Sequence, residues 1–396
     1  MTGSVSEPTP SPTPPTTSSA PADGADPGPD APPVGATYAG AGVDIEAGER
    51  AVDLIKPLVA STLRPEVLGG LGDFGGLFAL DTDRYPNPVL VAGTDGVGTK
   101  ALVAQATGRF ATIGIDLVAM CVDDLVCQGA EPLFVLDYIS TGAVEPAQMA
   151  DLVAGVAEGC RQVGATLLGG EMAEHPGVMK PGEFDLVGFA VGVVERTRTL
   201  GRANVAAGDV LIGLGSPGLR CNGYTLARHV LLERAGLPLD GPAWAGADVS
   251  LADELLRPSV IYTPAVRAAV EATLVDGVTG VRAAAHITGG GFPGNVHRAL
   301  PEGLRAVIDR STWEVPTVFT EIRRLGRVDD DEMARVFNLG VGMIVVVAPD
   351  RVDRALGALV GAGVDAFTVG LVEPGPRGVE FVGAPFWPAD GAGVAS

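Results

Sequence analysis

Glycine-rich turns divide this chain into short apolar runs, and this feature most constrains the fold. The chain has 56 glycines among 396 residues, and glycine adopts backbone conformations that strain other residues. Strand-like runs at 88–93, 132–140 and 184–195 alternate with helical patterns at 112–130 and 146–163. Short strands that alternate with helices predict an α/β or α+β architecture.

A second unit begins after residue 204. A strand-like run covers 208–216, and a helical pattern follows near 223–235. At about 100–200 residues per domain, the length is enough for two domains. We therefore expect an N-terminal domain over 37–204, a C-terminal domain over 205–375 and a tail over 376–396.

The first 36 residues have the composition of a disordered segment. Residues 1–36 are rich in proline, serine, threonine and alanine, with four acidic and no basic residues. Such a segment cannot bury enough apolar surface to offset its chain entropy. We expect a disordered tail over 1–36 and a folded part that begins near Tyr38.

Composition also argues against several classes of protein. The formal net charge is −21, whereas nucleic acid and anionic membranes need basic patches on their partners. No stretch approaches about 18 consecutive apolar residues, so no membrane span is expected. The N-terminus lacks the pattern of a signal peptide, and the four cysteines are too few and scattered for a disulfide scaffold or a zinc site. We expect a cytoplasmic protein.

The segment 89–103, VLVAGTDGVGTKALV, has the look of a nucleotide-binding loop but departs from the pattern. A Walker A loop places Gly-Lys before Ser or Thr, whereas Thr99 precedes Lys100 here and Asp95 stands where amides would hold phosphate. An acid beside phosphate is repulsive unless a cation lies between them. Thr94, Asp95, Thr99 and Lys100 place metal-binding oxygens next to a cation after a buried strand, where α/β proteins usually bind ligands. The segment predicts a phosphate site that works through metal, or an ordinary tight turn.

Three acids, Asp116, Asp123 and Asp124, lie within the predicted helix over 112–130. At about 3.6 residues per turn, Asp116 and Asp123 share nearly one face, and Asp124 is close by. The rest of the helix is so apolar that little of it should face solvent, and hard cations such as Mg²⁺ prefer carboxylate oxygens. The row predicts either a magnesium site or the polar stripe of an amphipathic helix.

Three glycine-rich loops predict further binding elements. The stretch 69–76 crowds glycines together, which predicts a mobile lid over a ligand or a flexible surface loop. The loops 213–224 and 286–295 each place glycines before a helix, whose free amides predict an anion site, with Arg220 and Asn222 beside the first loop. Each loop alone is also typical of a turn, but two in one domain favour a phosphate-bearing ligand.

The segment GGEMAEHPG places Glu171 after two glycines at the end of a predicted strand over 165–171. His175 in the same segment is a lone histidine. We expect it to be a packed or surface residue rather than a ligand.

Eight segments occur in an order that is specific to one family. They read YAGAGVDIEAGE, RPEVLGGLGDFGGLFAL, GTDGVGTK, TIGIDLVAMCVDDLVCQGAEPLFVLDYISTG, GGEMAEHPG, NGYTLAR, HITGGGFPGN and FNLGVGM. Together they closely resemble the aminoimidazole ribonucleotide synthetase family, whose members are also called phosphoribosylformylglycinamidine cyclo-ligases. The likeness runs from about Tyr38 to about Val372.

The resemblance implies a two-domain fold, α+β followed by α/β. The N-terminal domain would bind ATP and dimerise, with its sheets joining into a barrel across a homodimer, and the C-terminal domain would be α/β. The implied reaction is the ATP-dependent cyclisation of formylglycinamidine ribonucleotide to 5-aminoimidazole ribonucleotide, with ATP and Mg²⁺ as cofactors. Transfer of the γ-phosphoryl to the formamide oxygen gives an iminophosphate, which the substrate's own nitrogen attacks as phosphate leaves.

The resemblance also implies roles for individual residues. The implied catalytic residues are Asp95, Lys100 and His286. The implied metal ligands are Asp95, Asp116, Asp124 and Glu171. The residues implied to contact ATP or to form the lid are Gly69, Gly70, Gly72, Phe74, Gly75, Gly76, Thr94, Gly96, Gly98 and Thr99. The residues implied to bind the substrate are Glu171, Arg220, Asn222, Gly223, Thr288, Gly289, Gly290 and Gly291.

Several positions depart from the family pattern, namely Asp73, Asp123, Met172, His175, Arg220 and Cys221. Asp124 is the expected ligand rather than Asp123, because the family often has Asn at the latter position. Arg220 replaces a frequent histidine, so no histidine role carries over, but arginine would bind phosphate bidentately. The alternatives are another ATP-using member of the superfamily, such as selenophosphate synthetase or thiamine-monophosphate kinase, and a catalytically inactive nucleotide-binding relative.

Overall fold

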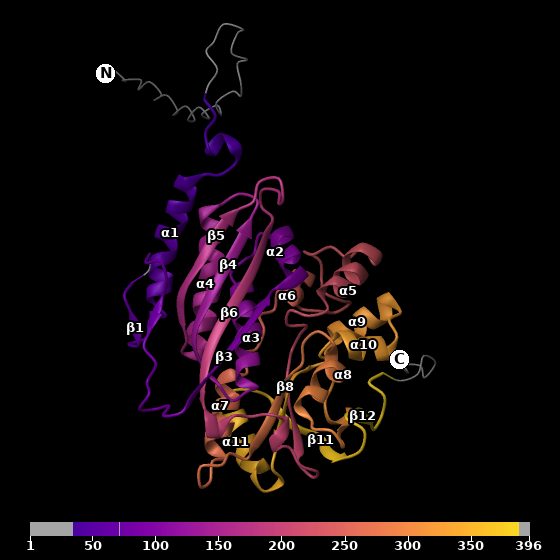
Figure 1. Ribbon diagram of the computed structural model, residues 1–396. Helices are drawn as coiled ribbons and strands as arrows, with labels where there is room; N and C mark the ends of the chain where they lie inside the picture. Colours follow the sequence, from indigo (N-terminus) through magenta and orange to yellow (C-terminus); the bar gives the residue numbers. More distant parts are fainter. Residues whose placement is uncertain (1–34, 71, 388–396) are drawn as a thin grey trace, which may run out of the picture. The chain divides into compact units, whose positions relative to one another are not determined.

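Two large sheets form the framework of the chain from Tyr38 onward (Figure 1). The computed structural model describes residues 35–70 and 72–387. The tail expected over 1–36 therefore lies almost wholly outside the described residues, and so do residues 388–396.

The first sheet has four strands in the order β3-β6-β4-β5. Their bounds are Pro88–Gly96 for β3, Glu131–Thr141 for β4, Thr166–Glu174 for β5 and Phe184–Glu195 for β6. β6 pairs antiparallel with β3 and β4, whereas β4 and β5 are parallel. A separate antiparallel pair, β1 (Val67–Leu68) and β2 (Leu77–Phe78), joins the two ends of the glycine-rich loop 69–76.

Three helices cover one face of this sheet: α1 (Ile45–Ala60), α3 (Ile113–Val126) and α4 (Pro146–Val163). α4 begins with a proline at its first position and ends before a left-handed glycine, both favoured there. Gly114 and Gly155 allow α3 and α4 to approach closely. A side chain at either position would overlap the backbone of the other segment. No helix in the described part of the chain is long and apolar enough to cross a membrane.

The opposite face of the four-stranded sheet carries exposed apolar side chains. Leu90 on β3 is 62% exposed, Phe189 on β6 41% and Tyr138 on β4 38%. All three occupy positions that alternate with the half-buried or buried residues facing the helices. The three exposed apolar side chains therefore lie on the same face of the sheet.

The second sheet has six strands in the order β12-β9-β11-β7-β10-β8. The strand bounds are β7 Val210–Gly215, β8 Val281–His286, β9 Leu304–Asp309, β10 Val341–Val347, β11 Ala366–Pro374 and β12 Gly378–Val382. All neighbouring pairs are antiparallel except β12 and β9. β12 places ordered sheet inside the expected tail over 376–396, because its backbone completes the ladder beside β9.

Helices cover both faces of the second sheet. α7 (Thr263–Ala272) and α11 (Val352–Gly361) pack on one face, while α8 (Gly291–Val296) lies on the other with α10 (Asp330–Val336) and α9 (Thr317–Gly326). All seven residues of β10 are buried, because alternate side chains enter two separate hydrophobic clusters. This sheet has no open face comparable to that of the first.

Three short helices lie where the two domains meet. They are α2 (Ala101–Thr107), α5 (Tyr224–Arg228) and α6 (Leu251–Leu255). α2 contacts α6, and α5 contacts the 3-10 turn Gly98–Lys100 that follows β3. The turn after Asp95 is therefore in direct contact with the C-terminal domain.

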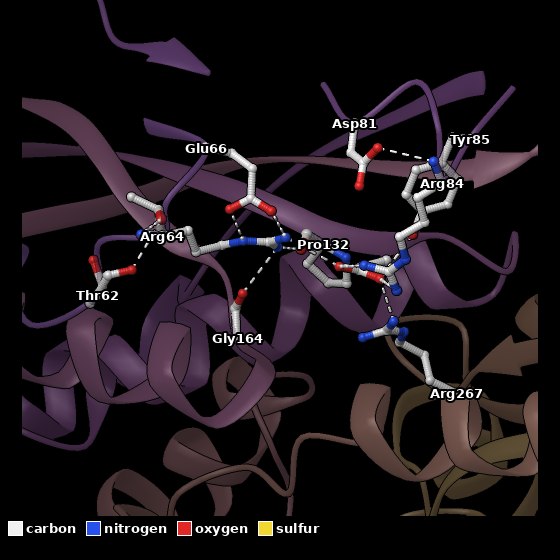
Figure 2. A network of polar contacts seen from close by, with 11 residues as sticks. Thr62, Arg64, Glu66, Asp81, Arg84, Tyr85, Pro132, Gly164 and Arg267 are labelled. Carbon is white, nitrogen blue, oxygen red and sulfur yellow. Dashed lines mark hydrogen bonds and ion pairs between the residues drawn. The ribbon is translucent and has the colours of Figure 1, made fainter. Parts of the chain in front are cut away.

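A buried carboxylate also ties the domains together. Glu131 at the start of β4 pairs with Arg84 at 2.5 Å and with Arg267 of α7, and it accepts a hydrogen bond from Tyr85 at 2.9 Å. Figure 2 shows Arg64, Arg84 and Arg267 converging from three separate segments. Burial alone would raise the pKa of Glu131, but Arg267, Tyr85 and Arg84 outweigh it and hold that pKa below its ordinary value. Glu131 is thus a fixed anion between the first sheet and α7.

Candidate active site

Asp95 lies near the end of β3, beside the junction of the two domains. Its Oδ1 accepts a hydrogen bond from the amide of Gly96 at 2.8 Å. Burial raises the pKa of this carboxyl, and the nearby carboxylate of Asp124 raises it further, while His286 opposes the shift. Asp95, Asp124 and His286 therefore lie close enough to interact, although they come from β3, α3 and β8.

The hydrogen bonds of His286 fix the orientation of its ring. Nδ1 lies 2.9 Å from Oδ1 of Asp124, and Nε2 lies 3.0 Å from Nη2 of Arg220. His286 is thus held between a guanidinium and a carboxylate, and it contacts one oxygen of Asp124, whose side chain is 55% exposed.

Lys100 and Asp116 form an internal ion pair instead of a phosphate and metal site. Both side chains are 0% exposed, with Nζ 2.6 Å from Oδ2 of Asp116. Lys100 also donates to the carbonyls of Arg220 and Arg257, and Asp116 accepts from the amide and hydroxyl of Ser259. Both side chains are thus held inside the protein in this structure, and the roles that the resemblance implied for them stay predictions.

Arg220 is enclosed as well, which differs from the expected phosphate contact. Its guanidinium pairs with Asp123 at 2.9 Å, donates to the carbonyl of Val260 and stacks on the ring of Tyr262. The other oxygen of Asp123 accepts hydrogen bonds from the backbone of Tyr262 and Thr263. The three acids of α3 thus differ in their surroundings. Asp116 and Asp123 are buried and bind segments of the C-terminal domain, whereas Asp124 is exposed.

The two glycine-rich loops of the C-terminal domain lie side by side. A side chain at Gly289 would come within 3.8 Å of Nδ2 of Asn222, and Oδ1 of Asn222 is buried without a hydrogen-bond partner. Gly223 has φ +77 and faces Phe337, while Gly291 has φ +56 and lies against the carbonyl of Ala334. Any side chain at either glycine would be strained and would collide, so both loops need glycine.

The remaining loop residues flank Asp95. Thr94 donates its hydroxyl to the carbonyl of Gly188 at 2.8 Å, and the hydroxyl of Thr99 lies 3.0 Å from that of Thr225 on α5. Gly98 has φ +55, which turns the chain after β3. The side-chain amide of Asn295 donates a hydrogen bond to the carbonyl of Thr288, which ties the second loop to α8.

The glycine-rich loop 69–76 borders a separate cavity of about 690 Å³ between α1, α4 and the strands β4 and β5. Glu171 lines the same cavity. Glu171 on β5 and Gly96 on β3 lie in the same row of the sheet, with β4 and β6 between them. Three strand spacings, or about 14 Å, therefore separate these two residues. Within residues 35–70 and 72–387, no group of three or more His, Cys, Asp or Glu could hold a metal ion. The four expected metal ligands therefore do not meet at one point.

Asp137, which was not among the predicted site residues, lines this cavity from the middle of β4. Its signal was available, because it is the one acid inside the apolar run 132–140. Buried acids within strands usually have a partner or a function.

The two domains of the chain match the two domain models of one protein family. Residues 78–194 match the family model "AIR synthase related protein, N-terminal domain", and residues 206–383 match "AIR synthase related protein, C-terminal domain". The phosphoribosylformylglycinamidine cyclo-ligase of Anaeromyxobacter dehalogenans (strain 2CP-1 / ATCC BAA-258) is 55% identical over 86% of this chain and 97% of its own. That of Myxococcus xanthus (strain DK1622) is 54% identical over the same shares. The chain belongs to the phosphoribosylformylglycinamidine cyclo-ligase family, as the sequence resemblance indicated.

Solved structures support the fold. The chain is similar to thiamine-monophosphate kinase from Stenotrophomonas maltophilia K279a, with a TM-score of 0.61, 20% identity and coverage of 84% of this chain and 96% of that one. It is also similar to hydrogenase maturation protein HypE in complex with ATP, with a TM-score of 0.57, 17% identity and coverage of 84% and 90%. The two-domain α/β architecture is confirmed.

Proposed function

We propose that this chain catalyses the ATP-dependent cyclisation of formylglycinamidine ribonucleotide to 5-aminoimidazole ribonucleotide, a ligase reaction of purine biosynthesis. The observation that carries the proposal is 55% identity to a cyclo-ligase across almost that relative's whole length. The thiamine-monophosphate kinase and hydrogenase maturation alternatives share only the fold, at 20% identity or less. Four buried free cysteines suit the reducing cytoplasm.

Asp95 and Asp124 are the residues proposed to hold Mg²⁺. They fit because Mg²⁺ is usually bound by one or two carboxylates together with substrate phosphates and waters, and because one side chain is half-buried while the other is exposed beside it. When bound, the ion would neutralise charge on the transferred phosphoryl group. His286 keeps Asp124 oriented, and Arg220 keeps His286 oriented in turn. Asp116 and Lys100 are proposed to position these elements rather than to touch ATP.

The adjacent loops 216–223 and 288–291 are proposed to hold the substrate's phosphate through backbone amides, beside Asn222. The stretch 69–76 is proposed as the lid over nucleotide. Both reacting atoms of the cyclisation belong to one molecule, so holding its folded conformer supplies much of the rate. Lys100 and Asn338 donate hydrogen bonds to the carbonyls of Arg220 and Gly218, and they are proposed to align the loop 216–223 for that purpose.

The reaction is tested by an activity assay of the full chain. With ATP, Mg²⁺ and formylglycinamidine ribonucleotide, we expect ADP and an aromatic amine to form in equal amounts. ATP hydrolysis should fall to background when the ribonucleotide is omitted. Nucleotide binding without either product would instead favour an inactive relative.

We further propose a homodimer in which the open faces of two four-stranded sheets meet as a barrel. Leu90, Phe189 and Tyr138 supply the apolar surface, and β3 and β5 are the edge strands. Leu90→Asp should convert a dimer into a monomer at micromolar concentration, as measured by light scattering after gel filtration. Val360→Asp, at an exposed position on α11, is the matched control and should leave the mass unchanged. A dimer that persists in Leu90→Asp would place the interface elsewhere.

A further inference from the structure

Asp137 is a buried acid with an unmet hydrogen-bonding capacity. Its Oδ2 is fully buried and has no hydrogen-bond partner. Burial raises the pKa of this carboxyl to about 7, and only its own backbone amide opposes the shift. Burying a polar group without a partner costs free energy, so native structures rarely keep one without reason.

The neighbouring strand leaves room for this carboxyl. Asp137 pairs with Gly170 of β5, where a side chain would stand 1.8 Å from Oδ1 of Asp137. Asp137 also shares a row of the sheet with Gly188 and, one strand further, Asp95. Because residue 170 is glycine, β5 leaves the carboxyl a slot that a side chain there would close.

The cavity that Asp137 lines is mostly apolar. Its walls include Val52, Ile55 and Val59 from α1 and Val153 from α4. Such walls fit a flat, uncharged ring or a short carbon chain. The cavity therefore has an apolar body with a carboxyl at the sheet.

Three of the four other acids in the described lining have hydrogen-bond partners, and the fourth, Asp73, is an exposed residue of the glycine-rich loop. Glu174 accepts hydrogen bonds from the amides of Asp44 and Val144, Asp44 caps α1, and Glu171 accepts from the amide of Met172. The described lining contains no Lys, Arg or His. With carboxyls and no basic side chain, this lining favours a group rich in N–H donors over a phosphate.

We propose that Asp137 binds the N–C–N edge of an amidine-like group in this cavity through its carboxyl oxygens. At the adenine edge, N6–H donates to one carboxyl oxygen and N1 accepts from a carboxyl that keeps its proton, whereas a protonated amidine donates two N–H groups to an ionised carboxylate. The proposal rests on the proposed reaction for its two sources of this chemistry. One is the N1–C6–N6 edge of adenine in ATP, and the other is the amidine of formylglycinamidine ribonucleotide.

The test compares Asp137→Asn with Asp151→Asn, which removes an exposed acid from α4 and should behave as wild type. Steady-state constants are measured for ATP, for the purine riboside triphosphate that lacks the 6-amino group, and for formylglycinamidine ribonucleotide. If adenine is the ligand, wild type should prefer ATP to the analogue by at least about tenfold, and Asp137→Asn should lose that preference. If the substrate amidine is the ligand, the nucleotide preference stays and kcat/KM for the ribonucleotide falls by at least about tenfold.

The proposal is overturned if Asp137→Asn keeps the nucleotide preference and the ribonucleotide constants within twofold of their wild-type values. Should that variant not fold, Val52→Trp fills part of the same cavity from α1 and leaves the acid in place, and unchanged constants for both substrates would overturn the proposal equally. Lack of turnover in wild type would refute the proposed reaction instead. The two failures are therefore distinguishable.

Discussion

Lys100→Met is expected to lower the free energy of unfolding by about 3–5 kcal/mol, because it leaves Asp116 as an unpaired charge in the interior. Both side chains are 0% exposed, and Asp116 keeps only the Ser259 hydrogen bonds once the ammonium is gone. The carbonyls of Arg220 and Arg257 lose their donor as well. Urea unfolding monitored by circular dichroism measures the change, and turnover should fall in step with the folded fraction.

The double variant Lys100→Met with Asp116→Leu separates the two roles of the lysine. Removing both charges should recover a large part of the lost stability, because the buried charge is gone. A Lys100→Met protein with wild-type stability and no turnover would show instead that the lysine acts on phosphate, as the resemblance implied.

Local sequence signals located the elements that carry their own boundaries. The helix predicted over 146–163 and the strand predicted over 184–195 match α4 and β6 residue for residue. α4 begins with a proline and ends at a glycine, and both residues mark helix ends in the sequence itself. Such punctuation needs no knowledge of distant residues.

Strands whose identity depends on distant partners were not predicted. β8 reads VRAAAH and β12 reads GVEFV, short segments with few strong strand formers or with flanking glycine. β8 is a strand because β10 pairs with it, and β12 because β9 does. Strand formation of this kind is set by packing and pairing more than by intrinsic preference.

The site shows the same limit. Helical spacing indicated that Asp116, Asp123 and Asp124 lie on nearly one face, and all three do point toward the C-terminal domain. Spacing alone cannot tell a metal ligand from an anchor, because the deciding partners lie far along the chain. Ser259 decides the role of Asp116, and His286 decides that of Asp124.

Asp95→Asn is expected to lower kcat by about 10²–10³-fold, since it removes one of two carboxylates proposed to hold Mg²⁺ at the transferred phosphoryl group. Rates are measured over a Mg²⁺ titration, with Asp151→Asn as the control for loss of a surface acid. A near-normal rate at saturating Mg²⁺ would remove Asp95 from the site.

Stability should move in the opposite direction to activity in Asp95→Asn. Burial, with Asp124 nearby, raises the pKa of Asp95 in the folded protein, so ionising this group on going to higher pH costs folding free energy. The asparagine variant should therefore melt at the same or a higher temperature than wild type at pH 8, and any difference should shrink as the pH falls toward the unfolded pKa of aspartate. Loss of turnover with retained or increased melting temperature is the signature of a carboxylate kept for chemistry, because an acid kept for structure would lower both.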